Sequence, residues 1–264
     1  MAFGVLRRWW GDQTMSITFT GGLGAQVLSA AAYLRLEMDG HGPMADLEYF
    51  TTAPQVAMAV KGAVSIWPWQ LDPFGITPAH FRGMARRSRC IIIRDSPEKT
   101  DLGIRGLQTQ EIRDKFPIPD GVRDLLPNGF PDHFACAHVR RGDYLNVASH
   151  IVSDDEFLQV LERHVPDMRA LVVVTDGVLD ISTIDRLRAR FEHLWIADRL
   201  PAWDCHRLLR ASAAMIGSNS QFSLVAALLH PTRRVFLPAR WFGSAVDQAP
   251  MESTLTRLGG FRAL

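Results

Sequence analysis

Two adjacent arginines stand in the middle of the chain, in the run His138-Val139-Arg140-Arg141-Gly142-Asp143-Tyr144 that follows an apolar stretch. Because side chains alternate along a strand, His138 and Arg140 are expected on one face while Val139 packs into the core. A guanidinium presents a planar fork of donors that binds phosphate oxygens bidentately. A departing nucleoside diphosphate needs fixed donors of this kind, because negative charge develops on it. The run therefore predicts a diphosphate site; a solvated turn with an internal arginine–aspartate pair is the alternative.

A second polar run, Ser218-Asn219-Ser220, separates a short apolar strand from an apolar helix. Ser and Asn are favoured helix caps, and the start of a helix offers N–H groups and partial positive charge to a phosphate. The run predicts either a phosphate contact or an ordinary cap. Asp176 follows a predicted strand and Asp204 begins a predicted helix. Either carboxylate is a candidate to accept hydrogen bonds from a nucleobase or a ribose, although Asp204 also suits a simple charge at a helix start.

Glycines precede the first predicted helix, in the run Gly21-Gly22-Leu23-Gly24-Ala25-Gln26. Glycine lets backbone N–H groups approach a ligand because no Cβ stands in the way. As a dinucleotide-binding fingerprint the run is incomplete, because Val27 stands where the third glycine belongs. The pattern predicts a strand-to-helix turn that faces a ligand; a plain turn is the alternative.

The elements that must position these runs alternate between strand and helix. In the first half we expect a strand at 16–20, a helix from the glycine run to Met38 and a strand at 90–94. In the second half we expect strands at 134–139, 170–175, 194–198, 214–217 and 234–237, and helices at 154–165, 181–193, 204–213 and 222–229. A capping box at Ser153–Glu156 marks the first of these later helices. Since parallel strands need a crossover, the pattern predicts parallel βαβ units, with ligands beyond the carboxyl ends of the strands.

Length and composition suit an α/β protein of one large or two compact domains, with 264 residues of which 47% are hydrophobic. Proline-rich segments at 117–120 and 127–131 predict a boundary between domains at 1–130 and 131–264. A net charge of +1 argues against a nucleic-acid-binding surface. The cysteines are Cys90, Cys136 and Cys205, whose spacing suits no metal site, so we expect buried thiols in a reducing cytosol.

No apolar run approaches the length of a membrane span, and the N-terminal stretch is too short for a secretory signal, so we expect a cytoplasmic protein. The segment Arg7-Arg8-Trp9-Trp10 has the residue types of an interfacial anchor. Peripheral contact at the inner membrane is one interpretation of it, and an unfolded leader is the simpler one. No pattern in the sequence specifies an oligomeric state.

Taken together, these runs resemble the α1,2-fucosyltransferases of glycosyltransferase family 11 and, more distantly, the α1,6- and protein O-fucosyltransferases. The run His138–Tyr144 matches the family's HxRRGDY motif, Gly21–Gln26 is similar to its GGLGNQ loop, and residues 219–223 are similar to its NSxFS segment. The order and spacing agree over residues 16–230. The chain departs from the family at Ala25, which replaces an asparagine, at Gly177, which replaces a common second aspartate, and at 224–225, which replace two tryptophans.

The resemblance implies a GT-B architecture, in which two Rossmann-like domains face a central cleft, and an inverting transfer of L-fucose from GDP-fucose to a glycan hydroxyl. Such an enzyme has a nucleotide-sugar donor and a carbohydrate acceptor as its partners, needs no metal or other cofactor, and serves surface-polysaccharide or glycan biosynthesis. Together with the arguments from the residues, it suggests catalytic roles for Arg140, Asp143 as the base, and His138. The suggested donor contacts are Arg140, Arg141, His138, Asp176, Asp204, Ser218, Asn219, Ser220, Gly22 and Gly24. The suggested acceptor contacts are Asp143, Tyr144 and Gln26.

Other functions stay open at this point. A glycosyltransferase could use another nucleotide sugar. A nucleotide-cofactor oxidoreductase would use Gly22–Gly24 as its phosphate loop and Asp46 or Glu48 as its ribose carboxylate, but would leave the arginine run without a role. A non-catalytic relative would bind a GDP-sugar without turnover. His138 could equally be a buried, hydrogen-bonded histidine without proton chemistry.

Overall fold

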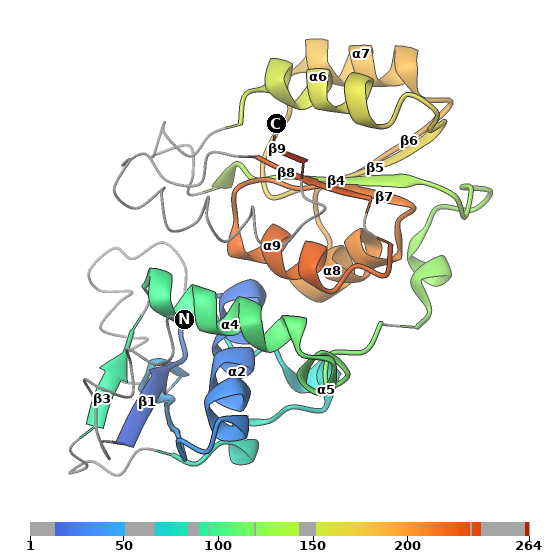
Figure 1. Cartoon of the computed structure of the whole chain (residues 1–264). Helices are drawn as coiled ribbons and strands as arrows, with labels where there is room; N and C mark the ends of the chain where they lie inside the picture. The colour runs from blue at the N-terminus through green and yellow to red at the C-terminus, as the bar shows by residue number, and fades with distance from the viewer. Residues whose placement is uncertain are drawn as a thin grey trace. The chain divides into compact units, whose positions relative to one another are not determined.

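The computed structural model describes residues 14–50, 67–83, 90–94, 96–118, 120–142, 152–232, 234–238 and 262–263. The chain divides into two compact units, Met1–Lys115 and Phe116–Leu264 (Figure 1). The division falls before the predicted boundary at 130/131. Arg210 of the second unit donates hydrogen bonds to the carbonyls of Phe116 and Pro117, at 2.9 and 2.8 Å, so the connecting segment belongs to that unit.

The first unit is built on a parallel sheet which, in the described residues, has the strand order β2-β1-β3. Its strands are β1 (Thr14–Thr18), β2 (Met44–Asp46) and β3 (Cys90–Ile93). Its helices are α2 (Leu23–Met38), α4 (Pro97–Gln108) and α5 (Gln110–Arg113), with short 3-10 turns η1 (Glu48–Phe50), η2 (Asp72–Phe74) and η3 (Pro78–His80). The pattern in the sequence predicted β1, α2 and β3 but neither β2 nor α4.

Helices α2 and α4 pack closely because α4 carries glycines at the contact. A Cβ on Gly103 would lie 2.5 Å from the Leu28 carbonyl oxygen, and a Cβ on Gly106 would overlap the Ala31 carbonyl oxygen. Because glycines weaken an isolated helix, the sequence pattern does not predict α4. Their role becomes clear only once the partner helix is in place.

The second unit contains a parallel sheet of the order β6-β5-β4-β7-β8-β9 in the described residues. The strands are β4 (Ala135–Val139), β5 (Ala170–Thr175), β6 (His193–Ala197), β7 (Ala214–Ile216), β8 (Val235–Leu237) and β9 (Arg262–Ala263). The turn η4 (Val122–Leu125) precedes them, and the helices are α6 (Asp154–His164), α7 (Ile181–Arg190), α8 (Ala202–Ala211) and α9 (Gln221–Leu228). Helices α6 and α7 cover one face of this sheet, and α8 and α9 cover the other (Figure 1).

The predicted α/β class with parallel sheets is confirmed in both units. The capping box is also confirmed, because the Ser153 side chain accepts from the Glu156 N–H while the Glu156 side chain accepts from the Ser153 N–H. Helix α7 ends at Arg190, earlier than predicted, because the chain pairs with β5 from His193 onward. In the described part of the chain, no helix is both long and apolar enough to cross a membrane.

Candidate functional site

The strand order of the second unit reverses between β4 and β7. From β4 the sheet grows through β5 to β6, and from β7 it grows in the other direction through β8 to β9. In open parallel sheets, ligands bind beyond the carboxyl ends of the strands at such a reversal. His138 is the penultimate residue of β4, and Arg140 directly follows the strand. Ser218 follows β7, with its Oγ 3.1 Å from the His138 Nδ1. Two of the polar runs singled out in the sequence therefore meet at the expected place.

A small pocket lies at this reversal. The polar residues that line the pocket are His138, Arg140, Arg141 and Ser218. Gly217, which lies between the end of β7 and Ser218, also lines it. Its other side is apolar and is formed by Val139, Val152, Phe157, Val160 and Ile216. The pocket thus combines guanidinium groups with a hydrophobic wall.

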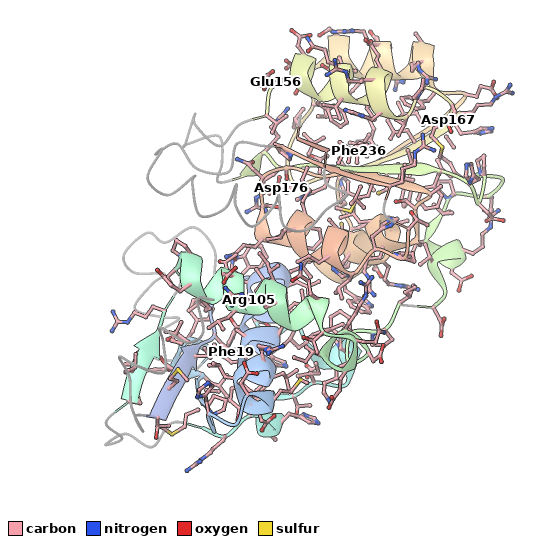
Figure 2. The ribbon with its side chains drawn as sticks, in the orientation of Figure 1. Phe19, Arg105, Glu156, Asp167, Asp176 and Phe236 are labelled. Atoms are coloured by element: carbon pink, nitrogen blue, oxygen red, sulfur yellow. The ribbon has the colours of Figure 1, made fainter. Side chains whose placement is uncertain are left out.

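Arg140 is the more exposed of the two arginines, with 20% of its side chain accessible against 7% for Arg141. Its Nη1 lies 2.5 Å from Oδ2 of Asp176, whose side chain is 31% accessible. Figure 2 labels the Asp176 side chain. This ion pair holds the guanidinium at the pocket while leaving it near solvent. An anion that enters the pocket therefore meets a guanidinium that is already oriented.

The neighbouring Arg141 is part of the scaffold. Its Nη1 donates to the Val152 carbonyl at 2.8 Å, and its Nη2 binds the Asp154 carboxylate at the start of α6. Its backbone N–H donates to Asp176 Oδ1 at 2.6 Å. The guanidinium that the sequence suggested as a donor contact is thus buried and bound to the protein's own acceptors, so its support of Arg140 is indirect.

His138 is buried and lies against hydroxyl groups. Its Nδ1 is 2.7 Å from the Ser223 Oγ, and its ring lies edge-on to Phe222 with centroids 5.0 Å apart. Burial, and secondarily the charge of Arg140, lower the pKa of His138 to about 3. Such an imidazole is neutral near neutral pH and is a weak proton acceptor. We therefore interpret His138 as a hydrogen-bonded element of the site rather than as its base.

The run Ser218-Asn219-Ser220 forms the N-terminal cap of α9. The Ser220 Oγ accepts from the Ser223 N–H at 3.2 Å, and the Ser218 N–H donates to the Ser223 Oγ at 3.0 Å. All three residues of the run are buried. Ser220 is thus an ordinary cap, and Ser218 is the member of the run that lines the pocket.

Asp204 lies in the first turn of α8, where its Oδ1 accepts from the Arg207 Nη1 at 3.0 Å. Two positions further along the helix, His206 is fully buried, and its ring centroid lies 5.7 Å from that of Phe222. Burial, followed by the charge of Arg210, lowers the pKa of His206. No motif in the sequence marks His206, whose one signal is a position on the apolar face of the helix.

In the first unit, the glycine run is held by Gln26. Its Nε2 donates to the carbonyls of Gly21 and Pro68, both at 2.8 Å, and its Oε1 accepts from the Gln70 N–H at 2.8 Å. The amide predicted to contact the acceptor therefore forms internal hydrogen bonds. A Cβ on Gly22 would lie 3.4 Å from the Trp67 ring, so this ring covers the glycine. Gly24 is buried inside α2.

A buried lysine of the first unit was also missed. Lys99 is 1% exposed, and its Nζ donates to the Thr18 carbonyl at 3.1 Å, which ties α4 to the end of β1. The cysteines are thiols, as expected, with Cys136 and Cys205 buried and Cys90 half-buried. Burial raises the pKa of Cys136, and it raises that of Cys205 to about 12. Asp143, Tyr144 and the segment Arg7–Trp10 lie outside the described residues.

No protein-family model matches the chain, and no curated protein matches it. Among solved structures, the chain is similar to E. coli ADP-heptose LPS heptosyltransferase II, with a TM-score of 0.47 and 11% identity over 96% of this chain and 90% of that one. It is similar to POFUT1 in complex with GDP, with a TM-score of 0.46 and 11% identity over 88% and 99%. It is also similar to E. coli heptosyltransferase WaaC with ADP, with a TM-score of 0.41 and 12% identity over 85% and 87%.

Proposed function

We propose that this protein is a glycosyltransferase that moves a sugar from a nucleoside diphosphate donor to a carbohydrate hydroxyl. The proposal is carried by the position of Arg140, which directly follows β4 at the strand-order reversal and lines a pocket together with Ser218. As the bond between sugar and diphosphate breaks, negative charge grows on the leaving group. A guanidinium held in place before the reaction stabilises that charge without further reorganisation.

The donor we propose is GDP-fucose, on the resemblance of the three sequence runs to the α1,2-fucosyltransferases. The acceptor hydroxyl attacks the anomeric carbon from the side opposite the diphosphate, so the configuration inverts through an oxocarbenium-like transition state. Asp143 is the proposed base, because its carboxylate directly follows the arginine loop in the sequence. The proposal includes the GT-B arrangement, a cytoplasmic location and no metal or other cofactor.

An oxidoreductase is the second candidate, because Asp46 ends β2, the strand beside β1, after the glycine run. A dinucleotide-binding turn needs its glycines open to a pyrophosphate. Here the Trp67 ring covers Gly22, and the Gln26 amide binds the Gly21 carbonyl. These contacts favour a structural role for the turn and, with it, the glycosyltransferase.

Calorimetric titration with GDP, UDP, CMP and NAD separates the candidates. We expect GDP to bind to the wild type, and an Arg140→Ala variant to lose at least tenfold in affinity while Arg163→Ala, an exposed arginine of α6, stays unchanged. Selective binding of UDP or CMP would show that the donor is not GDP-fucose but another nucleotide sugar. Binding of NAD alone would favour the oxidoreductase. Binding of no nucleotide would refute the proposal.

Transfer is then measured from GDP-fucose to an array of glycans. We expect at least one glycan to be fucosylated by the wild type and by Arg163→Ala, and none by Arg140→Ala at comparable rates. Donor binding without transfer to any glycan would identify a non-catalytic relative.

A further inference from the structure

The carboxylate of Asp176 contacts the arginine loop, residues 140–142 after β4, at two points. Oδ1 accepts from the Arg141 backbone N–H at 2.6 Å, and Oδ2 lies 2.5 Å from the Arg140 Nη1. The register places the ends of the two strands side by side, because Val139 of β4 pairs with Thr175 of β5. A single side chain from the turn after the neighbouring strand therefore contacts the Arg141 backbone and the Arg140 guanidinium.

Two glycines allow this close approach. A Cβ on Gly142 would lie 2.5 Å from Asp176 Oδ2 and 3.2 Å from its Cγ, and a Cβ on Gly177 would lie 2.5 Å from the Arg141 Cβ. The Arg141 Cβ is fixed to the backbone and cannot turn away. A side chain at position 177 therefore requires a shift of the loops, and one at position 142 requires the Asp176 carboxylate to turn away. The turns after β4 and β5 are thus packed at a distance that brings Asp176 to the arginines.

The other side of the loop is anchored independently of Asp176. The Arg141 guanidinium binds the Val152 carbonyl and the Asp154 carboxylate, and Asp154 Oδ2 accepts from the Asp180 N–H at 3.4 Å, at the start of α7. Arg141 therefore fixes the course of the backbone toward α6 and α7. The Arg140 guanidinium, by contrast, is bound by Asp176.

We propose that Asp176 is a positioning residue, which presents the Arg140 guanidinium to the donor diphosphate rather than contacting the donor itself. This inference rests on the proposed function. A long arginine side chain loses much rotamer freedom when it binds an anion. Holding it in its binding geometry beforehand removes most of that loss from the binding step. The role revises the donor contact that the sequence suggested for Asp176.

A double-mutant cycle tests this role, with the dissociation constants of GDP and inorganic pyrophosphate measured by calorimetry for the wild type, Asp176→Asn, Arg140→Ala and the double variant. The amide introduced by Asp176→Asn keeps an oxygen for the Arg141 N–H but lacks the charge that holds Arg140. We expect Asp176→Asn to weaken both ligands about tenfold in the wild-type background and to have no further effect beside Arg140→Ala. Asp185→Asn, which removes an exposed carboxylate of α7 paired with Arg188, is the matched control and should change neither constant.

Two results would overturn the positioning role. If Asp176 only competes with the diphosphate for Arg140, Asp176→Asn will bind pyrophosphate more tightly than the wild type. If Asp176 acts elsewhere, the loss will be equal in both backgrounds. Circular dichroism checks that each variant folds, and Asp176→Ser provides the same cycle if the asparagine variant does not fold. If the wild type binds neither GDP nor pyrophosphate, the proposed function and this inference are both refuted. If it binds them but the losses of affinity in the two single variants add up to the loss in the double variant, only the positioning role of Asp176 is refuted.

Discussion

Acidification should destabilise the second unit through His138. Burial first, and the charge of Arg140 second, lower its folded-state pKa to about 3, well below the ordinary value of 6.5. The unfolded chain therefore takes up a proton before the folded one does. The stability contributed by the neutral histidine is fully present above about pH 6.5 and is lost as the pH falls toward 3.

The size of this effect follows from the two pKa values. Between pH 7 and pH 5, one histidine with these values costs about 2 kcal/mol of unfolding free energy. Domains are commonly stable by only 5–15 kcal/mol, so a loss of roughly this size is measurable. Burial also lowers the pKa values of His206 and His230, so the wild type should lose more than His138 alone explains. The contribution of His138 is therefore the difference between the wild type and a variant.

The assay is urea unfolding of the wild type and of His138→Asn at pH 7 and pH 5, followed by circular dichroism. Asparagine keeps hydrogen-bonding capacity toward Ser218 and Ser223 without the titrating ring. We expect the loss of stability on acidification to be smaller in the variant by about 2 kcal/mol. His133→Asn, at an exposed position of the same unit, controls for the removal of a histidine as such. An equal loss in the wild type and in His138→Asn would refute the reasoning.

Three further predictions concern packing and hydrogen bonds. Gly106→Ala should lower the unfolding free energy of the first unit by at least about 2 kcal/mol in urea unfolding, because the added Cβ would meet the Ala31 carbonyl. Gly83→Ala is the control and should change it by no more than about 0.5 kcal/mol, because no atom lies within 4 Å of a Cβ there. Equal effects of the two substitutions would contradict the α2–α4 contact. Gln26→Ala removes hydrogen bonds to three backbone groups and should cost roughly 1–3 kcal/mol by the same assay, and a neutral result would show that the loop does not depend on this amide. Ser223→Ala removes the hydroxyl that contacts His138 Nδ1 and the Ser218 N–H; we expect a fall in melting temperature by calorimetry corresponding to about 2 kcal/mol, and an unchanged melting temperature would argue against this network.

The sequence predicted those elements whose signal is local. The strand Ala170–Thr175 is a continuous apolar run, and the Ser153–Glu156 capping box is complete within four residues, so both were predicted where they occur. The strand β2 has three residues, too few for a periodic pattern, and α4 depends on glycines that make sense only against α2. Local patterns therefore predicted the second unit better than the first.

The sequence predicted where the candidate site lies, but not which of its residues face the pocket and which support the fold. Arg140 and Arg141 are identical in residue type and adjacent in sequence, yet one faces the pocket while the other is buried against Val152 and Asp154. The register of β4 against β5 decides which of the two guanidinium groups pairs with Asp176, and that register is a long-range property. For the same reason the internal hydrogen bonds of the Gln26 amide could not be read from the glycine run.

The most direct test of the central claim is a crystal structure of the protein with GDP bound. We predict that the diphosphate lies beyond the ends of β4 and β7, with its oxygens within hydrogen-bond distance of the Arg140 guanidinium and with the Arg141 guanidinium still bound to Asp154. A GDP molecule bound elsewhere, or one in this pocket whose phosphates do not contact Arg140, would contradict it.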